Sequence, residues 1–151
     1  MDITASNLSA EAIETFLSEK QRERLDEDRR RADEAKTERD KLHQDFLQLQ
    51  VPPDAMERVA LMVRKALERG EKQALVFQFP SDWLPDQGRA ITNRAEDWHE
   101  HLDGFARRAY DYYEQHLRPR GFQLRAEILD WPNGMPGDVG LFLRWKRADA
   151  P

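Results

Sequence analysis

The tripeptide His99-Glu100-His101 is the first stretch whose residue types could do chemistry, because neutral imidazole is a common metal ligand. Both imidazoles would have to reach one ion. On a helix, residues two apart point in directions that differ by roughly 200°, whereas metal-binding helical pairs such as HExxH are spaced by four. Asp97 and His101 do have that spacing, which favours a local ion pair. Since the chain also lacks cysteine, we expect neither a metal nor a cofactor.

The segment from Ser81 to Asn93 is the best candidate for binding a small ligand. It follows an apolar strand-like run and enters a helix, a position at which α/β units bind ligands and free N–H groups suit an anion. Arg89 could pair with a phosphate or a carboxylate. The alternative is that these residues have structural roles only. Asp82 and Asn93 would then cap helices, and Gly88 would allow a tight turn. Neither GxGxxG nor GxxxxGK[ST] occurs, so the fingerprints of nucleotide binding are missing.

A second loop, residues 131–138, presents the apolar side chains Trp131 and Met135 among Pro, Gly and Asn. Such a loop could recognise a partner. The alternative is that both side chains pack on the core at one end of a sheet, which is the more common fate of an aromatic residue there. Asp130 and Asp138 flank the loop and could do acid–base work, although turn caps are the commoner role. No serine has a histidine near it in sequence, so we assign no catalytic residue.

These candidates must be positioned by a chain with an unusual N-terminal third. Eighteen of the 23 residues from 19 to 41 are Asp, Glu, Lys or Arg, and neither Gly nor Pro interrupts them. Opposite charges recur four residues apart, which supports an isolated helix. Ser9 is a suitable N-cap, and the first breaker is Pro52-Pro53. The pattern predicts a long solvated helix from about Ser9 to Leu49.

The apolar residues of this helix lie at its two ends, with Ile13, Phe16 and Leu17 at one end and Leu42, Phe46 and Leu49 at the other. Between them a heptad frame is half filled with apolar residues. Both a dimeric coiled coil and a single charged helix therefore remain open. Ile13, Phe16 and Leu17 would be exposed on a lone chain, so we expect them to need a partner surface.

Residues 51–151 show the alternation of helix and strand patterns that is typical of an α+β domain. The order is helix (54–69), strand (74–79), helix (93–118) and an antiparallel hairpin (122–128 and 139–145). We expect two helices on one face of a three-stranded sheet. The strand ALVFQF is apolar on both faces, which predicts an interior position, with Leu75, Phe77 and Phe79 facing the same way. The predicted domains are thus an extended helix (1–50) and a compact two-layer domain (51–151).

The charge distribution argues against nucleic acid and membrane partners. The net charge of −5 divides into −4 for residues 1–50 and −1 for residues 51–151. Residues 118–147 hold six basic and three acidic side chains, but no aromatic readout motif accompanies them. No apolar run approaches the roughly 20 residues of a spanning helix, and no secretory signal is evident. We expect a soluble cytoplasmic protein.

The sequence therefore favours a noncatalytic interaction or scaffolding module whose N-terminal helix self-associates or docks on a protein partner. The alternative is a small enzyme or an anion-binding regulatory domain that uses the 82–93 loop. The predicted association residues are Ile13, Phe16, Leu17, Leu42, Phe46 and Leu49. The predicted contacts with a ligand or partner are Asp82, Trp83, Arg89, Asn93, Trp131, Met135 and Asp138.

Overall fold

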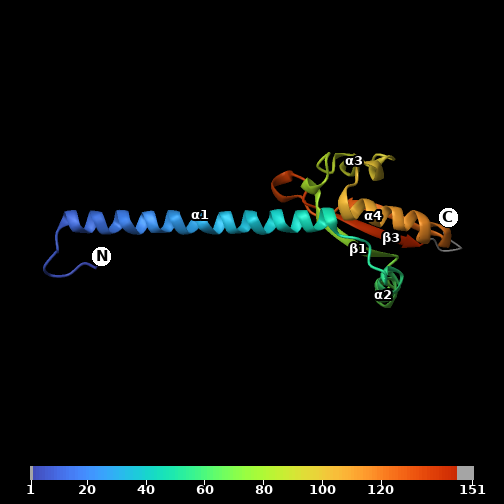
Figure 1. Ribbon diagram of the computed structural model, residues 1–151, viewed down its shortest axis with the longest axis horizontal. Coiled ribbons are helices and arrows are strands. Elements are labelled where there is room, and N and C mark those ends of the chain that lie inside the picture. Colours follow the sequence, from blue (N-terminus) through green and yellow to red (C-terminus); the bar gives the residue numbers. More distant parts are fainter. Residues whose placement is uncertain (1, 146–151) are drawn as a thin grey trace. The chain divides into compact units, whose positions relative to one another are not determined.

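The computed structural model describes residues 2–145 and confirms the α+β class (Figure 1). The chain divides after Gln44 into two compact units. We call residues 2–44 the N-terminal unit and residues 45–145 the C-terminal unit. Residues 45–50, which end α1 and follow it, thus belong to the second unit.

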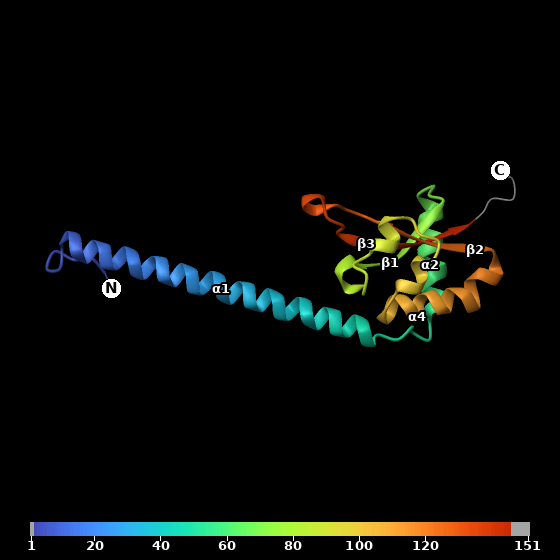
Figure 2. The same cartoon turned by 90° about the horizontal axis from the view of Figure 1, so that it is seen from above.

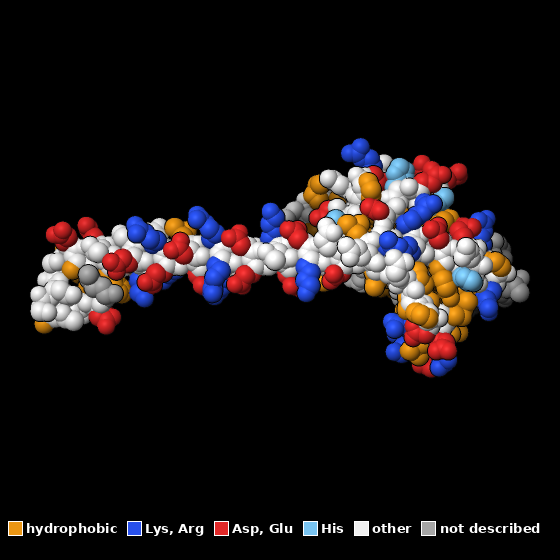
Figure 3. Space-filling view, in the orientation of Figure 1, with side chains coloured by type: hydrophobic (Ala, Val, Ile, Leu, Met, Phe, Trp, Pro, Cys, Tyr) orange, Lys and Arg blue, Asp and Glu red, His pale blue; other side chains and the backbone are white. Residues whose placement is uncertain are grey.

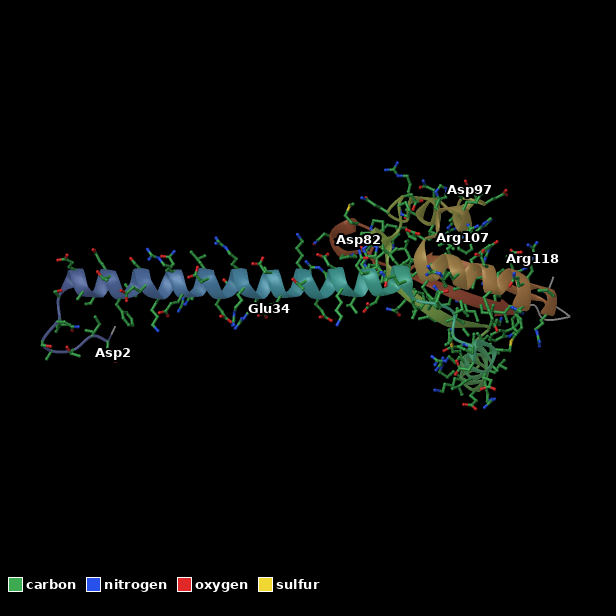
Figure 4. All side chains as sticks on the ribbon, viewed as in Figure 1. Asp2, Glu34, Asp82, Asp97, Arg107 and Arg118 are labelled. Carbon is green, nitrogen blue, oxygen red and sulfur yellow. The ribbon has the colours of Figure 1, made fainter. Side chains whose placement is uncertain are left out.

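The predicted long helix is present as α1, Ala10–Gln48. Ser9 begins it as predicted, since the Ala12 N–H donates to Ser9 Oγ at 3.0 Å. Every residue from 18 to 42 except Glu27 is exposed, and the side chains around Glu34 point outward from the helix (Figure 4). Among residues 2–145, no helix is both long and apolar enough to cross a membrane.

The sheet contains β1 (Gln73–Pro80), β2 (Phe122–Ile128) and β3 (Asp138–Trp145) in the order β1-β3-β2, with both pairs antiparallel. The predicted hairpin of β2 and β3 is confirmed. The predicted interior position of the first strand is wrong, because β3 pairs with a neighbour on each side. Val139, Leu141 and Leu143 of β3 are accordingly fully buried.

A β-bulge in β1 changes which of its residues face the core. Leu75 pairs with Phe142 and Phe77 with the adjacent Leu141, so Val76 is an extra residue between the two pairs. Neighbouring positions of β3 point to opposite faces. Leu75 therefore lies on the face opposite to Phe77 and is 41% exposed, while Val76 and Phe77 both pack against the core. The prediction that Leu75 and Phe77 share a face is wrong for this reason.

Two helical segments pack against the core face of the sheet, as predicted. The first is α2, Ala55–Glu68. The second is α4, Gly104–Tyr112, which continues as a π turn, Tyr113–Leu117, and a 3-10 turn, Arg118–Arg120. This second segment runs alongside the strands (Figure 2). Val59 and Val63 of α2 pack with Tyr113, Leu117 and Leu143 in one cluster.

The helix predicted over residues 93–118 is broken into pieces. After a 3-10 turn at Ser81–Trp83 come α3 (Arg89–Thr92), a second 3-10 turn (Trp98–His101) and only then α4. Asn93 is the C-cap of α3 and not the predicted N-cap. The N-cap of α4 is Asp103, whose carboxylate accepts from the Gly104 N–H at 2.8 Å.

The start of α4 is fixed by a close approach of two backbones. Gly104 has a φ of +56°, and a Cβ at this position would lie 2.9 Å from Leu47 Cα and 3.0 Å from the Phe46 carbonyl oxygen. Neither backbone atom can move aside as a flexible side chain could. Only glycine therefore allows α4 to begin against residues 46 and 47.

Gly104→Ala is expected to destabilise the protein more than Gly70→Ala. Both glycines have a positive φ, +56° and +74°, but a Cβ at Gly70 would have no heavy atom within 4 Å. The left-handed conformation alone should cost about 1–2 kcal/mol in each variant, and the steric overlap should add about 1–3 kcal/mol at Gly104 only. Urea unfolding of the full chain measures both values. Equal losses would show that the Leu47 contact does not constrain the fold.

Candidate functional site

The exposed apolar residues at the start of α1 form the first candidate surface. Ile13 and Leu17 are 41% and 58% exposed, and Phe16 is half-buried with the Lys20 ammonium 5.7 Å from its ring centroid. Positions 13, 16 and 17 have the spacing i, i+3, i+4 and therefore share one face of the helix. We call these three residues the N-terminal triad. It presents a small apolar face on an otherwise charged helix.

The second predicted apolar cluster of α1 does not act as one surface. Leu42 and Leu49 are each 48% exposed, but Phe46 is 4% exposed. The Phe46 ring centroid lies 5.2 Å from that of Phe79 and 4.9 Å from that of Trp83. Phe46 is therefore part of the core of the C-terminal unit. Trp83 is partly buried and packs against the same core cluster. The association surface has to be built from the remaining residues.

An apolar groove of about 430 Å³ lies between α2 and α4 over the core face of the sheet. We call it the α2–α4 groove. Its lining is represented by Leu49, Val59, Met62, Phe105, Tyr112 and Leu143, and Arg58 is the one charged residue among the lining residues. Apolar side chains gather between these two helices in the space-filling view (Figure 3). Sequence reasoning missed the groove, because only the folded chain shows that α2 and α4 leave a gap between their apolar faces.

One rim of the groove is held in place by a long-range contact. Arg108 of α4 donates through Nη1 to the carbonyl oxygens of Leu47 and Leu49, both at 2.9 Å. These bonds tie the segment that follows α1 to α4. Leu49 is thereby kept at the groove while its side chain stays half exposed.

The predicted ligand loop is organised by a residue that sequence reasoning did not single out. The carboxylate of Asp86 accepts from the N–H groups of Gly88 and Ala90 at 2.9 and 3.0 Å. These are the donors that an anion would need at the start of α3. Asp82, Arg89 and Asn93 are exposed, and their ligand role stays a prediction. The spacing Asp86 to Gly88 is an ordinary turn signal and could have identified this cap.

The hairpin loop presents its apolar side chains to solvent. Trp131 and Met135 are 52% and 65% exposed, so the interpretation that they pack on the core is wrong. Asp130 holds the loop instead, since its Oδ1 accepts from the Asp138 N–H at 2.7 Å and its carbonyl oxygen accepts from the Gly137 N–H. Asp138 Oδ2 accepts from Gln78 at 3.4 Å. The Asp130 carboxylate thus caps the turn, the Asp138 carboxylate contacts β1, and Trp131 and Met135 are exposed.

His99 and His101 turn to different neighbours. The His99 ring stacks on Tyr110 with centroids 4.7 Å apart. The His101 ring lies with Nε2 3.5 Å from Asp97 and Nδ1 3.8 Å from Asp86. The predicted contact between Asp97 and His101 is present. The two imidazoles do not converge on one point, in accord with the helical spacing argument.

Tyr110 of α4, Glu114 of the π turn and Arg118 of the 3-10 turn follow one another at intervals of four. Glu114 accepts from Tyr110 Oη at 2.8 Å and from Arg118 Nη1 at 2.9 Å. Burial, together with the bond to Glu114, raises the pKa of Tyr110 to about 12. The hydrogen bonds from Tyr110 and Arg118 lower the pKa of Glu114. These hydrogen bonds link α4 to the π and 3-10 turns that follow it.

Comparison of the chain with protein-family models, with curated proteins and with solved structures gives no match. The N-terminal triad and the α2–α4 groove are two apolar surfaces of the described residues, the first exposed on a helix and the second concave.

Glu114→Gln is expected to reduce stability at neutral pH and to reduce the loss of stability in acid. The folded pKa of Glu114 is lowered, so its contribution is complete above the ordinary pKa of 4.5 and disappears as the pH falls through the folded pKa. Urea unfolding at neutral pH and well below pH 4.5 should give a difference between wild type and variant that shrinks in acid. Glu57→Gln, at an exposed position of α2, is the control. A difference that is constant with pH would show that Glu114 is not coupled to Tyr110 and Arg118.

Proposed function

We propose that this protein is a noncatalytic interaction module that binds a protein surface through the N-terminal triad. The observation that carries the proposal is the exposure of Ile13 and Leu17, 41% and 58%, on a helix whose other exposed residues are mainly charged. The bound surface belongs either to another copy or to a different protein. The C-terminal unit offers further apolar contacts through Trp131, Met135 and the α2–α4 groove.

The relative size of two interactions supports this assignment. Burying apolar surface contributes roughly 25 cal/mol per Å², so a well-buried Leu or Ile adds about 1.5–3 kcal/mol. A surface ion pair, such as Arg30–Glu27 with an N–O distance of 2.7 Å, adds only about 0–1 kcal/mol. The charged middle of α1 can therefore maintain the helix and its solubility, but the triad has to supply most of the binding free energy.

The helical spacing of the triad also fits a known mode of recognition. Amphipathic helices bind apolar grooves through residues spaced i, i+3, i+4. The positions 13, 16 and 17 match this pattern. The partner surface is thus expected to be concave and apolar rather than flat and polar.

The alternative function, a small enzyme or an anion-binding domain at the 82–93 loop, draws less support. The backbone donors at the start of α3 are bonded to Asp86. Asp130, which was a candidate for acid–base work, accepts a backbone N–H within its own turn. Neither group is poised toward a bound substrate.

Leu17→Glu is expected to abolish partner binding, while Thr15→Glu is expected to preserve it. Both changes add one negative charge to an exposed position of the same helical turn, but residue 15 is on the opposite side of α1 from the triad. Tagged full-length chains expressed in cells are compared for the proteins that they retain, including untagged copies of themselves. Circular dichroism confirms that both variants keep the helix. Equal retention by wild type and Leu17→Glu would contradict the proposed function.

A further inference from the structure

The α2–α4 groove and the N-terminal triad have matching properties within one chain. The groove is apolar, has a volume of about 430 Å³ and leaves Val59, Met62 and Tyr112 only half covered. The triad is apolar and exposed at a helical spacing that suits a groove. Each surface therefore has the kind of partner that the other could provide.

The charges near the two surfaces are complementary. Residues 2–19, which contain the triad, hold four acidic and no basic side chains, a net charge of −4. Residues 54–71 and 104–120, which include the two helical sides of the groove and the ion-pair partners of Arg58 and Arg69, together hold eight basic and six acidic side chains, a net charge of +2. Arg58 lines the groove itself and is paired with Asp54 at its exposed rim. Opposite potentials favour this encounter and disfavour the pairing of two acidic triad segments side by side.

Part of the lining of the groove comes from the segment that follows α1. Leu49, Val51 and Pro52, which follow α1 directly, contribute to its lining, and Arg108 fixes the backbone of this stretch. If two α1 helices align in opposite directions, the first turns of each helix meet the last turns of the other. In that arrangement the triad of one copy would approach the segment that contributes to the groove of the other copy.

We propose that the α2–α4 groove binds the N-terminal triad of a second copy, so that two chains associate reciprocally with antiparallel α1 helices. This inference rests on the proposed function and names its partner. The association is isologous, since each copy gives one triad and receives one. Residues 10–48, which contain neither Gly nor Pro, form one continuous helix in each copy.

Site-directed crosslinking of the full-length protein tests this arrangement directly, because the chain contains no cysteine of its own. Leu17→Cys chains are mixed with Met62→Cys chains and treated with a short bismaleimide. The expected result is a product of two chains that joins residue 17 to residue 62. Neither variant alone should give a comparable product, because in the proposed pair each triad contacts a groove, and neither two triads nor two grooves meet.

Two matched pairs serve as controls. Thr15→Cys replaces Leu17→Cys in one mixture, since residue 15 lies on the other side of the same helical turn. Leu61→Cys replaces Met62→Cys in the other, since Leu61 is 45% exposed but does not line the groove. Both control mixtures should give much less crosslinked product.

Light scattering on Glu variants provides a second readout. Wild type is expected to have the mass of two chains, and Leu17→Glu and Met62→Glu are each expected to have the mass of one. A mixture of the two variants should regain pairs, because it contains one intact triad and one intact groove. Leu61→Glu controls for the added charge on α2 and should remain paired.

Three results would overturn the inference. Crosslinking of Leu17→Cys chains to each other would indicate parallel helices, paired Met62→Glu would show that the groove is not used, and a single-chain wild type would exclude self-association. In each of these cases the proposed function survives if Leu17→Glu still loses partner binding. If Leu17→Glu retains its partners, the proposed function itself fails.

Discussion

The burial of Phe46 is the contact on which the arrangement of the C-terminal unit depends. Its ring packs against Phe79 and Trp83, and its backbone lies so close to α4 that only Gly104 fits opposite it. The last residues of α1 are thereby joined to the core, and Arg108 extends the junction to Leu49. A large aromatic residue in such a position contributes about 3–5 kcal/mol, far more than any exposed ion pair of α1. This junction therefore determines where the Leu49 rim of the α2–α4 groove lies.

The elements that depend on local sequence were predictable. Ser9 and the uninterrupted charges set the span of α1, and the alternating residues of 122–128 and 139–145 identified the hairpin. The incorrect predictions concern features that depend on contacts between residues far apart in the sequence. The bulge at Val76 and the central position of β3 depend on strand pairing, while the late start of α4 depends on the approach of residues 46 and 47 to Gly104. No periodicity within one segment carries that information.

The candidate surfaces were predictable to a different extent. The N-terminal triad follows from sequence alone, because three apolar side chains on one face of a charged helix have nothing local to cover them. In the sequence, Phe46 also lies among charged residues with no local apolar cover. It is buried in the fold because it packs against Phe77 and Phe79, which lie in a strand some thirty residues away. The groove could not be predicted, because it is the space that remains after α2, α4 and the sheet have packed.

The open edges of the sheet offer another possible route to association, and features of both edge strands oppose it. β1 carries the bulge at Val76 and ends at Pro80, which lacks an N–H. β2 carries the exposed charges Arg125 and Glu127, and α3 lies near this strand. Bulges, prolines and charges are the devices by which edge strands avoid pairing with other chains. Self-association through β-strand addition is thus disfavoured on both sides, and helix docking in the apolar groove is the mode that the surface chemistry of this chain favours.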